Sequence, residues 1–268
     1  MKTQHVSVPL EARYRGAISR QESLPVLFGR NDELARLRSA LTSRRSQLLH
    51  GPAGVGKTIL LRTAIAAMPD VLFCDPANNF PSVLRQIASQ LVQHGNQIAR
   101  KKCGADGARI ADLSVVSLKG IVTISLSEGR YSVVLDHAGF TSQTFVAALK
   151  DVVTPSATRL VMTARSTHME DAGFMLKLFP FREDRLGLCD FDPPAARTFM
   201  ARVIREARLD AENLSDFEER LLEASHGNPG AVLRMVEMAR EPRYRSADRI
   251  LFAPLYIDFK LHGLERRA

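Results

Sequence analysis

The chain has 268 residues, 45% hydrophobic and 25% charged, a composition that allows a sizeable core and excludes disordered, collagen-like and disulfide-rich proteins. Its formal net charge of +8 comes from 37 lysines and arginines against 29 acidic residues, spread along the whole sequence. This charge suits phosphate-bearing partners such as nucleotides or nucleic acid, but an arginine-rich proteome produces it equally well.

Cysteine use and hydropathy indicate where the protein works. Cys74, Cys103 and Cys189 form no CxxC pair, so neither a disulfide framework nor a zinc site is expected. No stretch approaches the length of a membrane-spanning helix, and the first residues lack an apolar core followed by a cleavage site. We therefore expect a cytoplasmic protein with no membrane association.

The first 190 residues alternate between helical and strand patterns. Residues 1–25 have no clear periodicity and are interpreted as an N-terminal extension. Apolar residues at helical spacing then predict a helix that starts with Asn31 as its N-cap. Further helices are expected at 58–67, 81–94, 112–127 and 141–152, strands at 47–50, 71–74, 131–137, 159–165 and 185–188, and a polar, basic loop at 96–107.

One of these helices is ambiguous in sequence. Residues 112–127 are rich in β-branched side chains, which favour a strand, yet their apolar positions also fall on one helical face. We interpret the segment as a helix. The strands around it are short and hydrophobic throughout, as expected of parallel strands buried on both faces.

Only helices are expected after residue 190. Asp192 followed by two prolines predicts a helix over 193–208, and helices follow at 214–225 and 229–240. The sequence thus predicts a parallel α/β core at 26–190 and a small helical lid at 191–240. The tail, 241–268, contains an apolar run with aromatic residues, which either caps the lid or contacts a partner.

The most specific pattern fits GxxxxGK[ST] and lies between a predicted strand and a predicted helix. Glycines let the backbone curl so that successive N–H groups point at phosphate oxygens, and the helix N-terminus adds its positive end. The lysine reaches the β- and γ-phosphates while the threonine hydroxyl binds Mg²⁺. The eight residues of this loop are Gly51, Pro52, Ala53, Gly54, Val55, Gly56, Lys57 and Thr58.

An acidic residue at the end of a buried strand completes such a site. Asp136 follows the strand at 131–135, where it is expected to hold the magnesium ion. Many ATPases of this kind have a glutamate next, but this chain has His137. Histidine can act as the base that activates water, or it replaces the glutamate in a protein whose hydrolysis is slow or lost.

Taken together, these motifs resemble the ASCE branch of P-loop ATPases, and within it the AAA+ and STAND (signal-transduction ATPase) groups. The resemblance spans about 26–240 and implies a P-loop NTPase fold, a three-layer αβα sandwich with a parallel five-stranded sheet and a helical lid. It rests on the order and spacing of five stretches: LFGRNDELARL at 27–37, GPAGVGKT at 51–58, VVLDH at 133–137, LVMTARS at 160–166 and HGNPGAV at 226–232.

The resemblance assigns further residues to the nucleotide. Thr163 and Arg165 match the end of the sensor-1 strand, which implies that they address the γ-phosphate. Pro229 matches the lid proline that packs against adenine. Phe28, Gly29 and Arg30 match the Gly-Arg box beside the adenine.

Two departures from the family pattern are informative. Gly230 and Ala231 stand where AAA+ proteins place a sensor-2 arginine, and Arg234 is one turn further on. The winged-helix domain that usually follows the lid has no counterpart in the roughly 28 residues after Arg240, which are too few for a domain.

Three functions are favoured by this pattern; a small-molecule kinase shares the phosphate loop, but the Gly-Arg box and the Gly-x-Pro lid count against it. The first is a Mg²⁺-dependent ATPase that acts as a nucleotide-driven switch, with Lys57, Asp136, His137 and Arg165 as catalytic residues and Thr58 and Asp136 as metal ligands. The second is a DNA-associated accessory ATPase, supported by charge alone. The third is a nucleotide-holding scaffold. We expect ATP and Mg²⁺ as ligands, a nucleotide-dependent homo-oligomer and a protein partner. Arg182 and Arg185 lie where an oligomer could present an arginine finger, but Arg182 can equally well pair with Glu183 or Asp184 in solvent, so neither is assigned this role.

Overall fold

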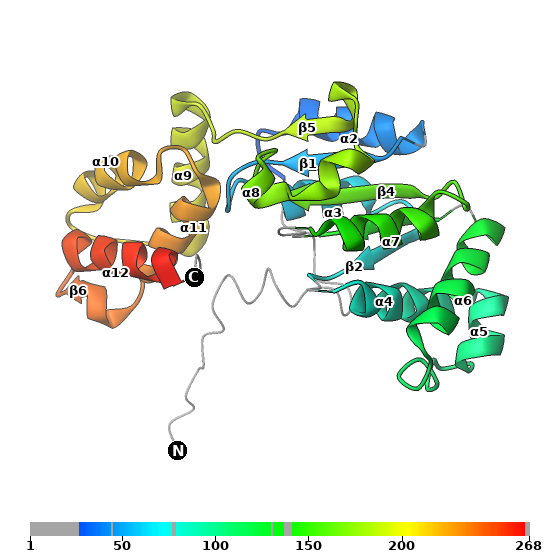
Figure 1. Ribbon diagram of the computed structural model, residues 1–268. Helices are drawn as coiled ribbons and strands as arrows, with labels where there is room; N and C mark the ends of the chain where they lie inside the picture. Colours follow the sequence, from blue (N-terminus) through cyan, green and yellow to red (C-terminus); the bar gives the residue numbers. More distant parts are fainter. Residues whose placement is uncertain (1–26, 44, 77–78, 130, 137–140, 266–268) are drawn as a thin grey trace, which may run out of the picture. The chain divides into compact units, whose positions relative to one another are not determined.

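The computed structural model describes residues 27–43, 45–76, 79–129, 131–136 and 141–265 (Figure 1). The described residues form two compact units, and each is treated separately here. The core unit comprises Arg30–Pro52 and Lys57–Leu188. The C-terminal unit comprises 27–29, Ala53–Gly56 and 189–265, so the tip of the phosphate loop is grouped with the C-terminal residues.

The core unit is built on a five-stranded sheet with the order β2-β3-β4-β1-β5. All four strand pairings are parallel. The α/β fold with a five-stranded parallel sheet, expected from the sequence, is therefore confirmed. Its strands are β1 (Gln47–His50), β2 (Val71–Cys74), β3 (Ser132–Leu135), β4 (Arg159–Ala164) and β5 (Arg185–Gly187).

Helices connect these strands, mostly where the sequence predicts them. The helix-or-strand ambiguity at 112–127 resolves as a helix, α6, whose N-cap Ser114 accepts a hydrogen bond from the Ser117 amide at 3.1 Å. The core helices are α2 (Asn31–Thr42), α3 (Lys57–Ile65), α4 (Phe80–Gln93), α5 (Gln97–Cys103), α6 (Val115–Glu128), α7 (Gln143–Val153) and α8 (Met169–Ala172), with 3₁₀ turns η1 (Phe174–Leu178) and η2 (Arg182–Asp184).

Two local predictions are wrong. The basic segment expected to be a loop at 96–107 contains α5, which Asn96 starts by accepting a hydrogen bond from the Ala99 amide at 2.9 Å. The N-cap of α2 is Arg30, not Asn31, and its side chain makes no capping hydrogen bond. The seven residues of α5 give too short an apolar pattern to indicate a helix, and the start of α2 is missed by one residue because apolar periodicity is weak at helix ends.

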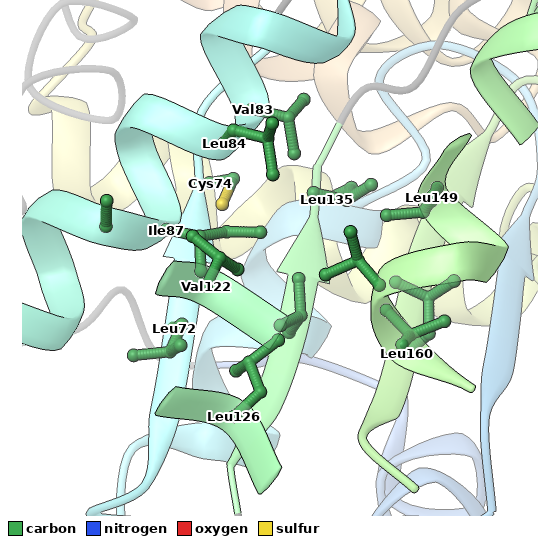
Figure 2. Close-up of a cluster of buried hydrophobic side chains, with 14 of the residues drawn as sticks. Leu72, Cys74, Val83, Leu84, Ile87, Val122, Leu126, Leu135, Leu149 and Leu160 are labelled. Atoms are coloured by element: carbon green, nitrogen blue, oxygen red, sulfur yellow. The ribbon is translucent and has the colours of Figure 1, made fainter. Parts of the chain in front are cut away.

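Helices α4, α6 and α7 cover one face of strands β2, β3 and β4. Figure 2 shows side chains from these six elements meeting in one cluster, with Leu72 of β2, Ile87 of α4 and Val122 of α6 among them. All three are fully buried. The alternate strand residues Leu49 and Val134 are also fully buried, so the sheet is covered on both faces, as parallel sheets generally are.

The edge strand β2 is protected by side chains from α4. The Phe73 amide donates to Gln90 Oε1 at 2.6 Å, and Gln90 Nε2 donates back to the Phe73 carbonyl. Just beyond the strand, the Asp75 amide donates to Gln86 Oε1 at 2.8 Å. These glutamines bond to backbone groups of an edge strand, which would otherwise be open to pairing with another chain.

The C-terminal unit has a hydrophobic cluster of its own. Residues after 240 add Tyr244, Ile250 and Leu255 to it, each at most 3% exposed. The expectation of helices alone is wrong here, because β6 (Arg245–Ser246) and β7 (Arg249–Ile250) form a short antiparallel ribbon. The helices are α9 (Pro193–Ala207), α10 (Leu214–Ser225), α11 (Pro229–Met238) and α12 (Phe252–Glu265), with the 3₁₀ turn η3 (Pro242–Tyr244).

Asp192 starts α9 as the sequence predicts, accepting a hydrogen bond from the Ala195 amide at 2.8 Å, with a proline in the first turn.

Among the described residues, no helix combines the length and the hydropathy needed to cross a membrane.

Candidate functional site

The phosphate loop lies between the end of β1 and the start of α3. Gly54 and Gly56 have φ values of +81° and +102°, in the region that favours glycine. A Cβ added at Gly56 would meet no atom within 4 Å, so a side chain there would project into open space. The glycine pattern thus produces the curled backbone that a bound phosphate group needs.

Lys57 begins α3 and is 7% exposed. Its Nζ donates to the carbonyls of Gly51 at 2.7 Å and Pro52 at 2.9 Å. The pKa of Lys57 is lowered to about 8, chiefly by burial and also by the nearby Arg165, while Asp136 and Asp171 oppose the shift. The ammonium group is therefore held at the loop by two carbonyls.

Asp136 connects three segments of the core unit. Its carboxylate accepts one hydrogen bond from Thr58 Oγ1 at 2.9 Å and another from Thr163 Oγ1 at 2.7 Å. Asp136 is 4% exposed and Thr163 is fully buried. These side chains lie close together because β3 and β4 are neighbouring parallel strands. Their carboxyl ends therefore lie at the same edge of the sheet as the carboxyl end of β1.

Arg165 follows β4 and is exposed, and its charge acts on Lys57. Asp171 of α8 also acts on Lys57 and accepts a hydrogen bond from Ser166 Oγ at 2.6 Å. Sequence reasoning missed Asp171, and no motif around it could have indicated this role. His137, proposed from sequence as a catalytic residue, lies outside the described residues.

The residues assigned to adenine fall in both units. In the C-terminal unit, Phe28 contacts the rings of Phe191 and Phe199, with centroids 5.7 and 5.5 Å away. Gly29 has φ +62°, and a Cβ there would lie 3.3 Å from the Phe191 ring.

Arg30 belongs to the core unit, is 7% exposed and forms an ion pair with Glu33 at 3.0 Å. Pro229 is buried at the first position of α11 in the C-terminal unit. The adenine role of these residues stays a prediction.

The sequence reasoning also missed polar residues beside the loop tip. Asn228, the N-cap of α11, donates from Nδ2 to the Ala53 carbonyl at 2.9 Å and to Asp190 Oδ1 at 2.8 Å. All three residues lie in the C-terminal unit. Asn228 was passed over because an asparagine before a proline is a common helix start.

Comparison with known families decides the classification. Residues 26–176 match the model of the AAA ATPase domain, which covers more than half of the chain and includes the phosphate loop and Asp136. The chain belongs to the AAA ATPase domain family. It is accordingly a nucleotide-binding ATPase of the P-loop class.

One solved structure supports the fold, and two others show a weaker similarity. A Walker-type ATPase of Pyrococcus abyssi is 17% identical, with a TM-score of 0.56 over 90% of this chain and 77% of that one. A STAND protein with a tetratricopeptide repeat sensor from Pyrococcus horikoshii is 16% identical, with a TM-score of 0.49 over 91% and 34%. Cdc6p of Pyrobaculum aerophilum is 13% identical, with a TM-score of 0.45 over 68% and 51%. No curated protein matches the sequence.

The residues present fit ATP and Mg²⁺. The open space at Gly56 and the buried Lys57 suit the phosphate groups. The Thr58 hydroxyl and the Asp136 carboxylate are adjacent oxygen donors, the ligand type that Mg²⁺ prefers.

Proposed function

We propose that the protein is a Mg²⁺-dependent ATPase that works as a nucleotide-driven molecular switch. The proposal rests chiefly on the Asp136 carboxylate, which the phosphate-loop hydroxyl of Thr58 and the β4 hydroxyl of Thr163 bind from two sides. A change in the phosphate groups bound at the loop is thereby transmitted through Asp136 to strands β3 and β4. This arrangement couples an ATPase site directly to the sheet of the core unit.

Each residue has a role that follows from its chemistry. The Lys57 ammonium group neutralises charge on the β- and γ-phosphates, and it must leave the carbonyls of Gly51 and Pro52 at least in part to do so. Thr58 and Asp136 would hold Mg²⁺, which when bound neutralises phosphate charge and polarises the γ-phosphoryl group. Arg165 adds a second positive charge beside Lys57, suited to charge that develops during transfer.

His137 decides whether hydrolysis is fast. As a neutral imidazole it can take a proton from the attacking water, which gives a true ATPase. If it cannot, the nucleotide stays bound and the protein acts as a scaffold. Cytoplasmic location, a protein partner and nucleotide-dependent assembly are parts of the same proposal.

The test is turnover of radiolabelled ATP with Mg²⁺ by the wild type, Lys57→Ala and His137→Ala, each with and without duplex DNA. We expect turnover by the wild type, none by Lys57→Ala and a loss of about 10²- to 10⁴-fold in His137→Ala if this histidine is the general base. His94→Ala, which changes an exposed histidine at the end of α4, is the matched control and should not affect turnover.

The other outcomes separate the alternatives. Turnover that rises with DNA identifies an accessory ATPase that acts on nucleic acid. Tight ATP binding without product in any condition identifies a nucleotide-holding scaffold. Absence of ATP binding by the wild type contradicts the proposal as a whole.

A further inference from the structure

The tip of the phosphate loop is bonded to the start of α11 by its backbone carbonyls. Asn228 Nδ2 donates to the Ala53 carbonyl at 2.9 Å, and the Gly230 amide donates to the Gly54 carbonyl at 2.9 Å. Ala53–Gly56 and α11 belong to the same compact unit. Two consecutive peptide groups of the loop are thus held from one side.

The packing at this contact leaves no room for side chains. A Cβ on Gly230 would lie 2.6 Å from the Gly54 Cα, and a Cβ on Gly54 would lie 2.6 Å from Asn228 Oδ1. Both glycines are therefore needed for backbone to meet backbone. The presence of Gly230 after Pro229, where a family arginine was expected, follows from this contact.

Asn228 is itself fixed at three points. Its Oδ1 accepts from the Ala231 amide at 3.0 Å, which caps α11, while its Nδ2 bonds to both Ala53 and Asp190. The Asp190 carboxylate accepts from the same amide nitrogen and so orients it as the donor to the Ala53 carbonyl. The side chain is half-buried, so water competes with its protein partners for these hydrogen bonds only in part.

Fixing these carbonyls also fixes the neighbouring N–H groups. The C=O and N–H of a trans peptide point in opposite directions, and the described residues contain no cis peptide bond. Because the Ala53 and Gly54 carbonyls point toward α11, the amides of Gly54 and Val55 point away from it. Backbone N–H groups of such a loop are the donors that bind phosphate.

We propose that Asn228 is a positioning residue, which sets the direction of the phosphate-binding amides of the loop by holding the Ala53 carbonyl. This inference rests on the proposed nucleotide binding and extends it to a residue that no loop motif includes. It makes the strength of phosphate binding depend on a side chain of α11.

The test compares affinity for fluorescent ADP with thermal stability in four variants. Asn228→Ala removes the cap and both donated bonds. Asn228→Asp keeps the cap acceptor but places a carboxylate against Asp190 and the Ala53 carbonyl. The double variant Asn228→Asp/Asp190→Asn exchanges the amide and the carboxylate, so it can restore the bond between positions 190 and 228 but not the bond to Ala53.

Asn213→Ala is the matched control in the same unit. Asn213 precedes α10, and its amide donates to the Ile250 carbonyl at 3.0 Å and accepts from the Ile250 amide at 2.8 Å. Its loss therefore removes a comparable bridge that does not involve the phosphate loop.

We expect both Asn228 single variants to bind ADP about tenfold more weakly, the magnitude of one lost hydrogen bond. The double variant should have a higher melting temperature than Asn228→Asp but the same weakened affinity for ADP. Asn213→Ala should have a lower melting temperature than the wild type but an unchanged affinity for ADP. The inference is overturned if Asn228 variants bind ADP like the wild type, or if affinity follows melting temperature through all four variants. If the wild type binds no nucleotide, the proposed function fails first and this inference fails with it.

Discussion

The charge of Lys57 is the residue-level property on which phosphate binding depends. Its pKa is lowered to about 8, chiefly by burial, so the free protein begins to lose this charge just above neutral pH. Bound phosphate groups favour the charged form and raise the pKa again. Above about pH 8, binding must therefore take up a proton, and affinity falls as pH rises.

This predicts a specific pH profile. The affinity of the wild type for ATP should fall by up to about tenfold per pH unit above pH 8. Lys57→Arg, whose guanidinium keeps its charge throughout this range, should bind more weakly but with a flat profile. Binding titrations from pH 7 to 9.5 measure both, and a flat profile for the wild type would show that the charge of Lys57 does not control affinity.

Thr163 donates to Oδ1 of Asp136, while Thr58 of the phosphate loop donates to Oδ2. Thr163→Val keeps the shape and removes the donor, so one oxygen of a buried carboxylate loses a hydrogen bond at 2.7 Å. We predict a loss of about 1–3 kcal/mol in the free energy of unfolding and a weaker dependence of ATP binding on Mg²⁺.

The controls separate the two effects. Thr163→Ser should restore both, because it keeps the hydroxyl. Thr158→Val, which removes a hydroxyl bonded to Ser156 at 2.6 Å in the same unit, should leave the Mg²⁺ dependence unchanged. An unaltered Mg²⁺ titration in Thr163→Val would contradict the role given to this bond.

Sequence could indicate the phosphate loop and Asp136, because each is a short local pattern beside an apolar strand. It could not indicate that Asp136 bonds to Thr163 and Thr58 together, because that depends on the order of strands in the sheet. Asn228 and Asp190 are 38 residues apart and have no motif in common, so only the fold brings them together.

At the scale of elements, α4 both covers the sheet and closes its edge. Gln90→Ala removes the two hydrogen bonds to Phe73 and leaves the amide and carbonyl of an edge strand without them. We predict a loss of about 1–3 kcal/mol in the free energy of unfolding and a greater tendency to aggregate.

The matched control is Gln93→Ala, an exposed glutamine on the same helix, which should change stability by less than about 0.5 kcal/mol. Urea unfolding followed by circular dichroism, with light scattering for aggregation, measures both variants. Equal stability of the two variants would contradict the role of Gln90.

Sequence distinguishes helix from strand best where the periodic pattern of apolar residues extends over many positions. The segment at 112–127 was ambiguous because α6 is apolar on most sides, and its buried face includes Leu118, Val122 and Leu126. Helix α5 was missed because its seven residues give too short a pattern, and its basic side chains resemble those of a loop.

At the scale of the whole molecule, the residues that the structure describes form two hydrophobic clusters that have no residue in common. Leu255 of α12 is fully buried in the C-terminal cluster, so the tail is part of that unit's core. Leu255→Ala should cost about 2–5 kcal/mol. The loss of amide hydrogen-exchange protection should fall mainly on residues 189–265.

Ile257→Ala on the same helix is the control, because its side chain is 58% exposed and its loss should have little effect. Equal loss of protection in both units after Leu255→Ala would show that they unfold together. From sequence, the tail was only an apolar run, because its core contacts depend on a ribbon of two-residue strands, β6 and β7, that no pattern predicts.

The central claim is that residues 51–58 and Asp136 form an ATP site. The most direct measurement is equilibrium binding of radiolabelled ATP with Mg²⁺ to the wild type, Lys57→Ala and Asp136→Asn. We predict saturable binding of one ATP per chain by the wild type and a loss of at least about tenfold in affinity in each variant. Equal ATP binding by all three proteins, or none by the wild type, would contradict the account.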